Sequence, residues 1–476
     1  MCSSDLAGAA LSADGMRVTG DLACDEGFSS KGELRLLGAT ISADVSFNGA
    51  VLDGNGANAL NADRIQIAGS LFCRDGFACK GELRLLSATI GGNVDFVDAA
   101  LDGNGKFALS GDGMQVAGNL FFNDGFSSKG ELRLLSATIG SVVNFSGARL
   151  DGGDAAALNA DGMKVAGSLF CRDQFSVTGD TCLVGASIKG LLDWRPSSWT
   201  GELDLSHASA GRWRDAWKKG TKTPPVILDH FTYGAFLADA GMKVDADTRI
   251  AWIEAAQGDE FKPGAYHTLA RVLRAAGDDR GAADVGLAKE RARAKHRAAS
   301  YGGLRRWGFR LWSWFLDRTI GHGYRPWRGA AWLSVLLVAG WIFFGWGAPT
   351  TVGGPGLIKP ADPVFITQNH SGNAMEYWRS LNEQAVLRRG HNISYALPVE
   401  YPPFSAFWYS LDTLFPLIDL GLERAWSPSP VGSVKDDGWA WALLFYLYFH
   451  IIMGWVLSTL TVVALTGLIK RDKEAE

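Results

Sequence analysis

The hexapeptide Gly32-Glu33-Leu34-Arg35-Leu36-Leu37 occurs three times in the chain, and its recurrence decides the fold of the N-terminal region. The second copy occupies residues 81–86 and the third occupies residues 130–135, so successive copies are 49 residues apart. A degenerate fourth copy begins one period later, at Gly179. Self-similarity at a fixed period indicates a repeat architecture, in which each unit packs on the next.

Each 49-residue unit is built from short apolar segments. Apolar residues stand at every second position, as in Leu34/Leu36 and Val45/Phe47, and clusters of Gly, Asn and Asp interrupt them. This pattern predicts short strands joined by tight turns. A length of 49 residues suits two rungs of about 22 to 27 residues, so we expect a right-handed β-solenoid over residues 1–208. Because the repeat is lost upstream of Ala10, we also expect further rungs before the first residue.

Small residues stand two positions before an aliphatic residue, as in Ala39/Ile41 and Ala50/Leu52. This spacing resembles the pentapeptide-repeat family, although the five-residue period is not strict. All 15 prolines lie at or after Pro196, which fits a solenoid whose rungs must donate their ladder hydrogen bonds. Acidic pentapeptide solenoids imitate a DNA duplex, so the resemblance leaves DNA mimicry as an alternative function.

The charge of the chain is not that of a nucleic-acid-binding protein. The formal net charge is −4 over 476 residues, whereas such proteins are strongly basic. Residues 1–200 hold 15 basic and 23 acidic residues, a balance of −8. The Glu/Arg pairs of the hexapeptides share one strand face and are expected to stack at alternate rungs as charged ladders. We interpret this face as solvated, with an unknown protein partner as the alternative.

Cysteine and glycine patterns that suggest cofactors have simpler explanations. Cys24, Cys73 and Cys171 share a repeat position with Phe122, and a position that accepts phenylalanine indicates packing rather than metal ligation. Residues 54–59 match the dinucleotide fingerprint, but they recur in a turn position with no helix after them. Aspartates beside these glycines suit turns better than a calcium ladder. We therefore predict no catalytic residue, no cofactor and no metal, and a reducing cytosol around the solenoid.

The composition changes after the solenoid. We expect a connector over residues 209–244 and a helical hairpin over residues 245–300 with Gly277 at its turn. The stretch Lys289–Arg328 holds 11 basic and two acidic residues, and large aromatic side chains alternate with its cations. This alternation predicts a basic aromatic helix over residues 301–328 that lies in lipid headgroups. Its expected membrane-interface anchors are Arg306, Arg310, Trp312, Trp314, Arg325, Trp327 and Arg328.

Two uncharged apolar segments, residues 329–348 and 438–469, predict transmembrane helices, because about 20 residues cross the hydrocarbon core of a bilayer. A loop over residues 349–437 joins them, and a tail over residues 470–476 follows. Eleven Lys and Arg residues precede the first span within 40 residues, whereas the long loop holds only six. The positive-inside rule therefore predicts that both termini are cytoplasmic and that the loop is extracytoplasmic. We expect the bacterial inner membrane.

The loop contains an apolar stretch, residues 404–421, that is too short to span and suits a re-entrant helix. A span, a short helix and a second span resemble the pore module of two-span potassium channels. However, Pro416-Leu417-Ile418 replaces the Gly-Tyr-Gly filter of those channels, so potassium selectivity is not expected and a structural helix is favoured over a conducting one. The candidate pore or re-entrant residues are Ser410, Asp412, Thr413, Pro416 and Asp419.

His450 lies inside the second predicted span. An ionisable side chain within a membrane is a candidate functional group. We favour a neutral histidine that is hydrogen-bonded to a neighbouring helix. A lone hairpin buries little surface, so we also expect a homo-oligomer through the transmembrane hairpin.

Three further segments carry a family resemblance: Leu228–Gly234, Tyr266–Arg274 and Gly323–Arg328. With the solenoid and the two spans, they resemble a family of bacterial membrane proteins whose members often carry the automatic label membrane-associated oxidoreductase. That resemblance implies a redox enzyme as one hypothesis. From the residues themselves, the first hypothesis is a membrane-anchored scaffold or sensor, and the second is an ion channel gated by the solenoid.

Overall fold

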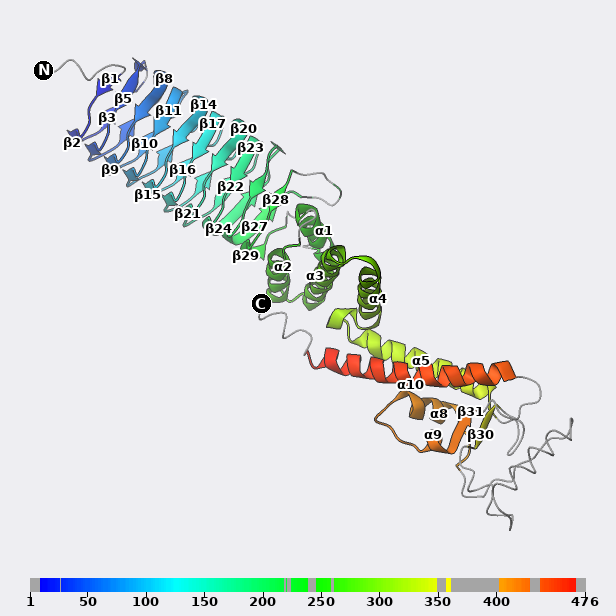
Figure 1. Ribbon diagram of the computed structural model, residues 1–476. Helices are drawn as coiled ribbons and strands as arrows, with labels where there is room; N and C mark the ends of the chain where they lie inside the picture. The colour runs from blue at the N-terminus through cyan, green and yellow to red at the C-terminus, as the bar shows by residue number, and fades with distance from the viewer. Residues whose placement is uncertain are drawn as a thin grey trace, which may run out of the picture. The chain divides into compact units, whose positions relative to one another are not determined.

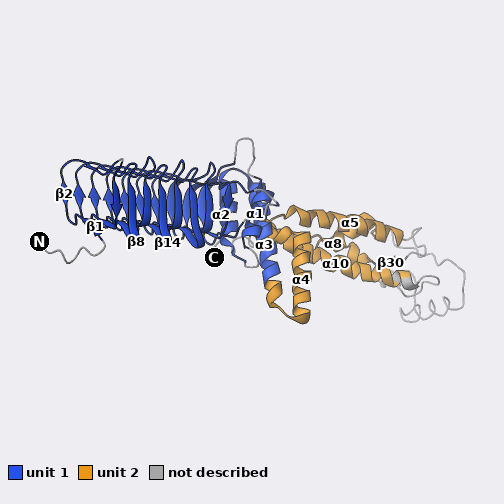
Figure 2. Cartoon of the chain, turned by 90° about the horizontal axis from the view of Figure 1, so that it is seen from above, with its two compact units in different colours: residues 1–296 blue, residues 297–476 orange. Residues whose placement is uncertain are grey.

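The computed structural model describes residues 9–25, 27–217, 220, 224–238, 245–257, 261–348, 357–360, 402–428 and 437–467. Residues 9–236 form a β-solenoid of about ten turns, as the repeat predicts (Figure 1). The chain divides into two compact units, residues 1–296 and 297–476, which are coloured separately in Figure 2. Each unit is described by itself.

Within the described residues, the solenoid has two long parallel sheets. The first sheet holds β1 (Ala9–Ser12), β4 (Ser29–Lys31), β5 (Glu33–Arg35), β8 (Val51–Asn61), β11 (Ala78–Arg84), β14 (Ala100–Ser110), β17 (Ser127–Arg133), β20 (Arg149–Asn159), β23 (Ser176–Cys182), β25 (Ser198–Trp199), β26 (Leu203–Asp204) and β28 (Val226–Ile227).

The second sheet receives shorter strands, usually two from each rung. They are β2 (Arg17–Val18), β3 (Leu22–Ala23), β6 (Thr40–Ile41), β7 (Val45–Ser46), β9 (Gln66–Ile67), β10 (Leu71–Phe72), β12 (Thr89–Ile90), β13 (Val94–Asp95), β15 (Gln115–Val116), β16 (Leu120–Phe121), β18 (Thr138–Ile139), β19 (Val143–Asn144), β21 (Lys164–Val165), β22 (Leu169–Cys171), β24 (Ser187–Trp194), β27 (Ser209–Asp215) and β29 (Thr232–Phe236).

The 49-residue repeat consists of two unequal rungs. Strands β4, β8, β11, β14 and β17 begin at residues 29, 51, 78, 100 and 127, so rungs of 22 and 27 residues alternate. This confirms the prediction of two rungs per repeat. Most of the extra residues of the longer rung bulge out of β8, β14 and β20 at residues 54–57, 103–106 and 152–155, which we call the rung loops. The last three residues of each rung loop are exposed.

The glycines that open the second and third hexapeptides each lie beneath a rung loop. Gly81 and Gly130 have positive φ angles of 116° and 105°. A Cβ atom at Gly81 would collide with the carbonyl oxygen of Ala57, and one at Gly130 would collide with that of Lys106. Glycine is required because both the φ angle and the close approach of the loop exclude a side chain.

An aromatic column fills the interior of the solenoid. The rings of Phe96 and Phe122 are nearly parallel at 5.3 Å between centroids, and those of Phe122 and Phe145 at 4.8 Å. All three side chains are 0% exposed. Cys73 and Cys171 are also buried, and Cys171 pairs in register with Trp194 of the next rung. These cysteines therefore lie in the core, where they add to the packing.

The charged ladders of the hexapeptides lie at alternate rungs, as expected. Arg84 of β11 is in register with Asn61 on one side and Ser110 on the other. Its guanidinium lies 2.7 Å from the carboxylate of Asp63, and Arg133 repeats this contact with Asp112 at the same distance. Each arginine is thus neutralised by an aspartate 21 residues earlier in the chain.

The solenoid extends beyond the expected end at residue 208, because β27, β28 and β29 add rungs within the expected connector. Trp213 is 1% exposed and fills the interior there. Three helices follow: α1 (Ala246–Gln257), α2 (Gly264–Ala275) and α3 (Asp279–Ser300). Gly277, with a φ angle of 81°, lies at the turn between α2 and α3, where the hairpin was expected.

Helices α1 and α2 cover the last rungs. The Thr268 hydroxyl donates a hydrogen bond to the Phe231 carbonyl at 3.0 Å. Arg249 of α1 lies 2.9 Å from Asp215 of β27, and both side chains are less than a tenth exposed. A terminal rung has unpaired carbonyl groups that would accept further strands, and these contacts occupy part of that edge.

The second unit contains α4 (Gly303–Thr319), the 3-10 turn η1 (Gly321–Gly323), α5 (Trp327–Trp346), α8 (Ala406–Leu414), α9 (Leu422–Ala425) and α10 (Asp437–Leu465), together with the antiparallel strands β30 (Ile358–Pro360) and β31 (Trp426–Pro428). Helix α8 packs against both α5 and α10. Residues 1–8, most of the expected 349–437 loop and the 470–476 tail lie outside the described residues.

Candidate functional site

Among the described residues of the second unit, two helices are long and apolar enough to cross a membrane. They are α5, with a mean hydropathy of 1.7, and residues Trp441–Leu465 of α10, with 1.8. Only 22% and 33% of the residues in these apolar stretches are buried. Large apolar side chains point outward instead: Ile342 is 64% exposed and Phe445 is 67% exposed. A helix of a soluble core buries such side chains, whereas a membrane helix presents them to lipid.

Helix α8 approaches α5 and α10 closely because a glycine faces it on each. A Cβ atom at Gly340 of α5 would collide with the Ser410 hydroxyl and the His450 ring. A Cβ atom at Gly454 of α10 would collide with the Leu414 carbonyl group. Small residues at helix contacts let backbones pack at short range. The two glycines therefore form the seat of the short helix.

Ser410 and His450 join α8 to both long helices, and both side chains are 0% exposed. The Ser410 hydroxyl donates to the Leu337 carbonyl of α5 at 3.0 Å. His450 Nε2 lies 3.2 Å from the Ser410 carbonyl and 3.3 Å from its hydroxyl. The Tyr446 hydroxyl lies 3.3 Å from His450 Nδ1. We call these three side chains the polar clamp.

The geometry of the polar clamp assigns the histidine tautomer. Tyr446 can donate to Nδ1, and Nε2 with its proton can donate to the Ser410 carbonyl, so a single proton satisfies both ring nitrogens. Because the Ser410 hydroxyl already donates to Leu337, it cannot also be activated by the histidine as a nucleophile. The polar clamp therefore orients α8, and these contacts occupy the hydrogen-bonding groups of its side chains.

Asp412 holds the turn that follows α8. It is 6% exposed, and its carboxylate accepts backbone hydrogen bonds from Leu420 at 2.6 Å and Glu423 at 2.9 Å. The second donor lies at the start of α9, where a carboxylate also meets the positive end of the helix dipole. Burial, followed by the neighbouring carboxylates of Asp412 and Asp419, raises the pKa of Glu423.

The other candidate pore residues have separate surroundings. Thr413 is buried, and its hydroxyl donates to the Tyr409 carbonyl of the same helix at 2.8 Å. Pro416 lies in the turn after α8. Asp419 is exposed, accepts from the Gly421 N–H at 3.0 Å and lies 3.0 Å from Arg424. Within one chain, the five candidates therefore do not form a common free surface.

The expected interface anchors lie on α4, in the turn before α5 and at the start of α5. Trp312, Trp314 and Trp327 are 53%, 59% and 65% exposed, and Arg306 and Arg310 are exposed beside them. Arg325 and Arg328 are partly buried. The Arg328 guanidinium donates to the Asp317 carbonyl at 3.3 Å, and the Trp332 indole donates to the Arg318 carbonyl at 3.2 Å. These bonds tie the end of α4 to the first apolar helix.

Sequence reasoning missed Tyr446, Gly340 and the Leu337 carbonyl. Tyr446 stands four residues before His450, on the same helix face, and that spacing could have identified it. Nothing in the sequence marks Gly340 or Leu337, because their roles depend on α8, which is 73 residues away from Leu337 along the chain.

Other suggested sites have structural roles. The Asp53 carboxylate accepts the Asn55 N–H at 2.9 Å, and Asp102 and Asp151 repeat this contact in their own rung loops at 3.0 Å. The glycine fingerprint lies in strand β8. Among the described residues, no group of three or more His, Cys, Asp or Glu side chains is placed to hold a metal ion.

No protein-family model, curated protein or solved structure matches this chain.

Proposed function

We propose that the protein is a membrane-anchored scaffold or sensor, in which the solenoid binds a protein partner and the α5/α10 hairpin anchors it in the bilayer. One observation carries this: a solenoid with regularly spaced exposed rows is joined in one chain to two apolar helices whose large side chains face outward. Repeat arrays of this kind expose extended surfaces that suit partner binding.

In this proposal the solenoid faces the cytoplasm of a bacterium and the hairpin crosses its inner membrane. The basic residues before α5 support this orientation through the positive-inside rule. The exposed tryptophans and arginines of α4 suit a helix that rests among anionic headgroups. Its hydrogen bonds to α5 hold it next to the point of membrane entry.

Lysine substitutions at exposed apolar positions test the membrane anchor. Replacing both Val338 and Ile342 with lysine should remove the protein from the alkaline-washed membrane pellet, because each charge costs about 2.5–3.5 kcal/mol at the centre of a membrane helix. The matched control is Val51→Lys, at a solenoid position that is 49% exposed. Equal retention of both variants would contradict a lipid-facing α5. A reporter fused after Glu476 tests the cytoplasmic orientation.

Ion conduction is the competing hypothesis, and it predicts single-channel currents from the purified full chain in planar bilayers. Our proposal predicts none, because Ser410, Asp412 and Thr413 are engaged within one chain. Currents that change with Asp419→Asn would favour a channel formed by a homo-oligomer of the hairpin.

A redox enzyme is the third hypothesis, which follows from the family resemblance alone. It predicts flavin absorbance in the purified protein or saturable binding of a nicotinamide nucleotide. Either result would replace the scaffold as the proposed function.

A further inference from the structure

One row of charged side chains runs along the first sheet of the solenoid with a different sign on each successive rung. The register pairs Lys31 with Asp53, Asp53 with Lys80, and so on through Asp102, Lys129 and Asp151. We call these six side chains the ladder row. Adjacent members are one rung, or about 4.8 Å, apart.

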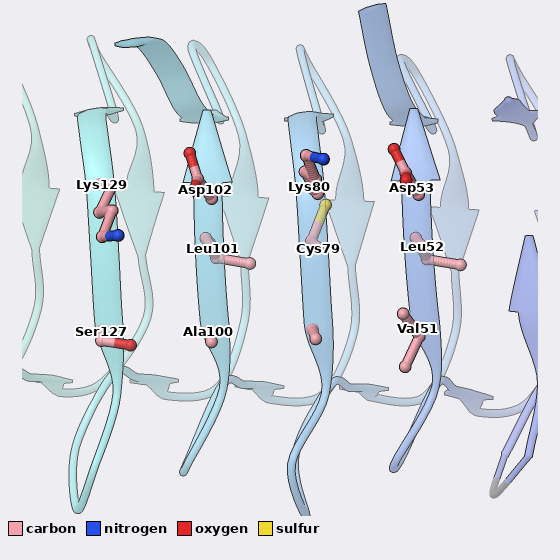
Figure 3. A pocket seen from close by; sticks show the side chains of 11 residues that line it. Val51, Leu52, Asp53, Cys79, Lys80, Ala100, Leu101, Asp102, Ser127 and Lys129 are labelled. Carbon is pink, nitrogen blue, oxygen red and sulfur yellow. The ribbon is translucent and has the colours of Figure 1, made fainter. Parts of the chain in front are cut away.

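Four members of the ladder row, Asp53, Lys80, Asp102 and Lys129, line a shallow hollow of about 450 Å³ on the sheet surface (Figure 3). The hollow forms because small side chains stand on the same strands two positions before members of the ladder row. They include Ala78, Ala100 and Ser127. All three lysines of the row are exposed, and each aspartate is at least partly exposed. The row is thus accessible to another macromolecule.

When the ladder row is read in the opposite direction, each lysine position is replaced by an aspartate and each aspartate position by a lysine. If a second copy of the solenoid lies face to face with the first and runs antiparallel to it, Lys31 meets Asp151 of the second copy, Asp53 meets Lys129, and Lys80 meets Asp102. Every one of the six positions then faces an opposite charge. The twofold axis of this arrangement runs along the strands, between the rungs of Lys80 and Asp102, and gives an isologous interface.

The rung loops have the same complementarity in shape. They belong to the rungs of the three aspartates, whereas the rungs of the three lysines have a single glycine, such as Gly81, at that point. Reversal of the order places each exposed loop opposite a rung that lacks one. At the centre, Ala78 faces Ala100 of the second copy, so small side chains meet where the surfaces are closest.

A parallel alignment of two copies would place like charges opposite one another. Without a shift along the solenoid, each lysine would face a lysine and each aspartate an aspartate. Like charges in register across an interface are unfavourable. A parallel alignment shifted by one rung would pair opposite charges at five positions instead of six and would not be isologous, so the ladder row favours the antiparallel orientation.

We propose that the ladder row and the rung loops form a self-recognition surface through which two solenoids of this protein associate as an antiparallel dimer. The occupant of the hollow is a second copy of the chain. This surface lies on the solenoid, whereas the homo-oligomer contact expected from the sequence lies on the membrane hairpin.

Charge reversal separates this dimer from a row that only stabilises its own solenoid. Lys80→Asp and Asp102→Lys each place like charges at two facing pairs of the dimer, so each should weaken association by about tenfold or more. The double variant K80D/D102K restores opposite charges between copies but creates like-charged neighbours, Asp53 with residue 80 and residue 102 with Lys129, within each copy. Recovery of the dimer by the double variant is expected. Failure to recover, with a folded protein by circular dichroism, would overturn the proposal.

The association is measured on the full chain in detergent micelles, by sedimentation at low salt and at about 0.5 M salt, where surface charges are screened. A zero-length carbodiimide then joins lysine and aspartate side chains that are in contact. A Lys31–Asp151 crosslink identifies the antiparallel dimer, since these residues are five rungs, or about 24 Å, apart within one copy. A dimer without that crosslink, or one that is insensitive to both single reversals, shows association through another surface and overturns the proposal.

Discussion

Large apolar side chains lie inside the solenoid, whereas many of them lie on the outside of the second unit. In the solenoid, Phe122 and Phe145 are 0% exposed and the charged ladders lie outside. In the second unit, Ile342 and Phe445 are mostly exposed, whereas the polar clamp lies inside. The two patterns suit different solvents. Water drives the aromatic column inward, whereas in the lipid that we propose around α5 and α10, packing and hydrogen bonds would hold the helices together.

The units also differ in how their stabilising contacts are distributed. Each rung of the solenoid repeats the contacts of its neighbours, so the structure depends on a pattern. The position of α8 depends on single residues, namely Gly340, Ser410 and His450. Substitutions that separate core packing from individual polar contacts test this comparison.

The largest effect is expected in the aromatic column. Phe122→Ala should lower the free energy of unfolding of the solenoid by about 3–5 kcal/mol, because it leaves a cavity between two stacked rings. Urea unfolding followed by circular dichroism measures the loss. The control, Val51→Ala at an exposed position of the solenoid, should change stability by less than about 0.5 kcal/mol. Similar losses for both variants would show that the column is not the core.

A smaller loss is expected at the turn after α8. Asp412→Asn weakens two hydrogen bonds from backbone N–H groups to a carboxylate, so it should cost about 1.5–3 kcal/mol. Asp419→Asn is the matched control, because that side chain is 65% exposed. Thermal unfolding in detergent compares the two. If Asp419→Asn proves the more harmful change, Asp412 does not hold the turn.

The buried thiols predict a loss of stability in alkali. Burial raises the pKa of Cys79 from 9.0 to about 12. The folded protein holds this proton more tightly than the unfolded chain does. The contribution of the protonated thiol to the free energy of unfolding is therefore complete below pH 9.0 and is lost as the pH rises toward 12. At pH 10.5 the loss is about 2 kcal/mol.

Cys79→Val is the matched variant for this prediction, because Val177 occupies the same repeat position. Urea unfolding at pH 8 and 10.5 should show a smaller alkaline loss for the variant than for the wild type. Equal losses would mean that Cys79 holds its proton no more tightly in the folded protein than in the unfolded chain.

The smallest effect concerns the seat of α8. Gly340→Ala should lower the melting temperature in detergent, with a cost of about 1–2 kcal/mol from overpacking against Ser410 and His450. Gly345→Ala on the same helix is the control, since its Cβ would lie 3.6 Å from Ala406, an ordinary contact. The control should gain stability through helix propensity. A gain at both glycines would contradict the close approach of α8.

Much of the fold could be predicted because its signals are local. The hexapeptide repeat gave the period and the two rungs, since each strand and turn is encoded within about ten residues. The apolar stretches gave both long helices for the same reason. The end of the solenoid could not be predicted from the sequence, because β27 and β29 continue the sheet through backbone hydrogen bonds beyond the last copy of the hexapeptide.

Residue patterns alone predicted the rung lengths and the apolar character of α5 and α10. The packing of the helices was needed to show that His450 contacts Ser410, and the strand register was needed to show that the ladder row alternates in sign along one face. The physical reason is distance along the chain. Contacts between residues 40 or 73 positions apart depend on how helices pack, whereas strands, turns and spans depend on neighbours in sequence.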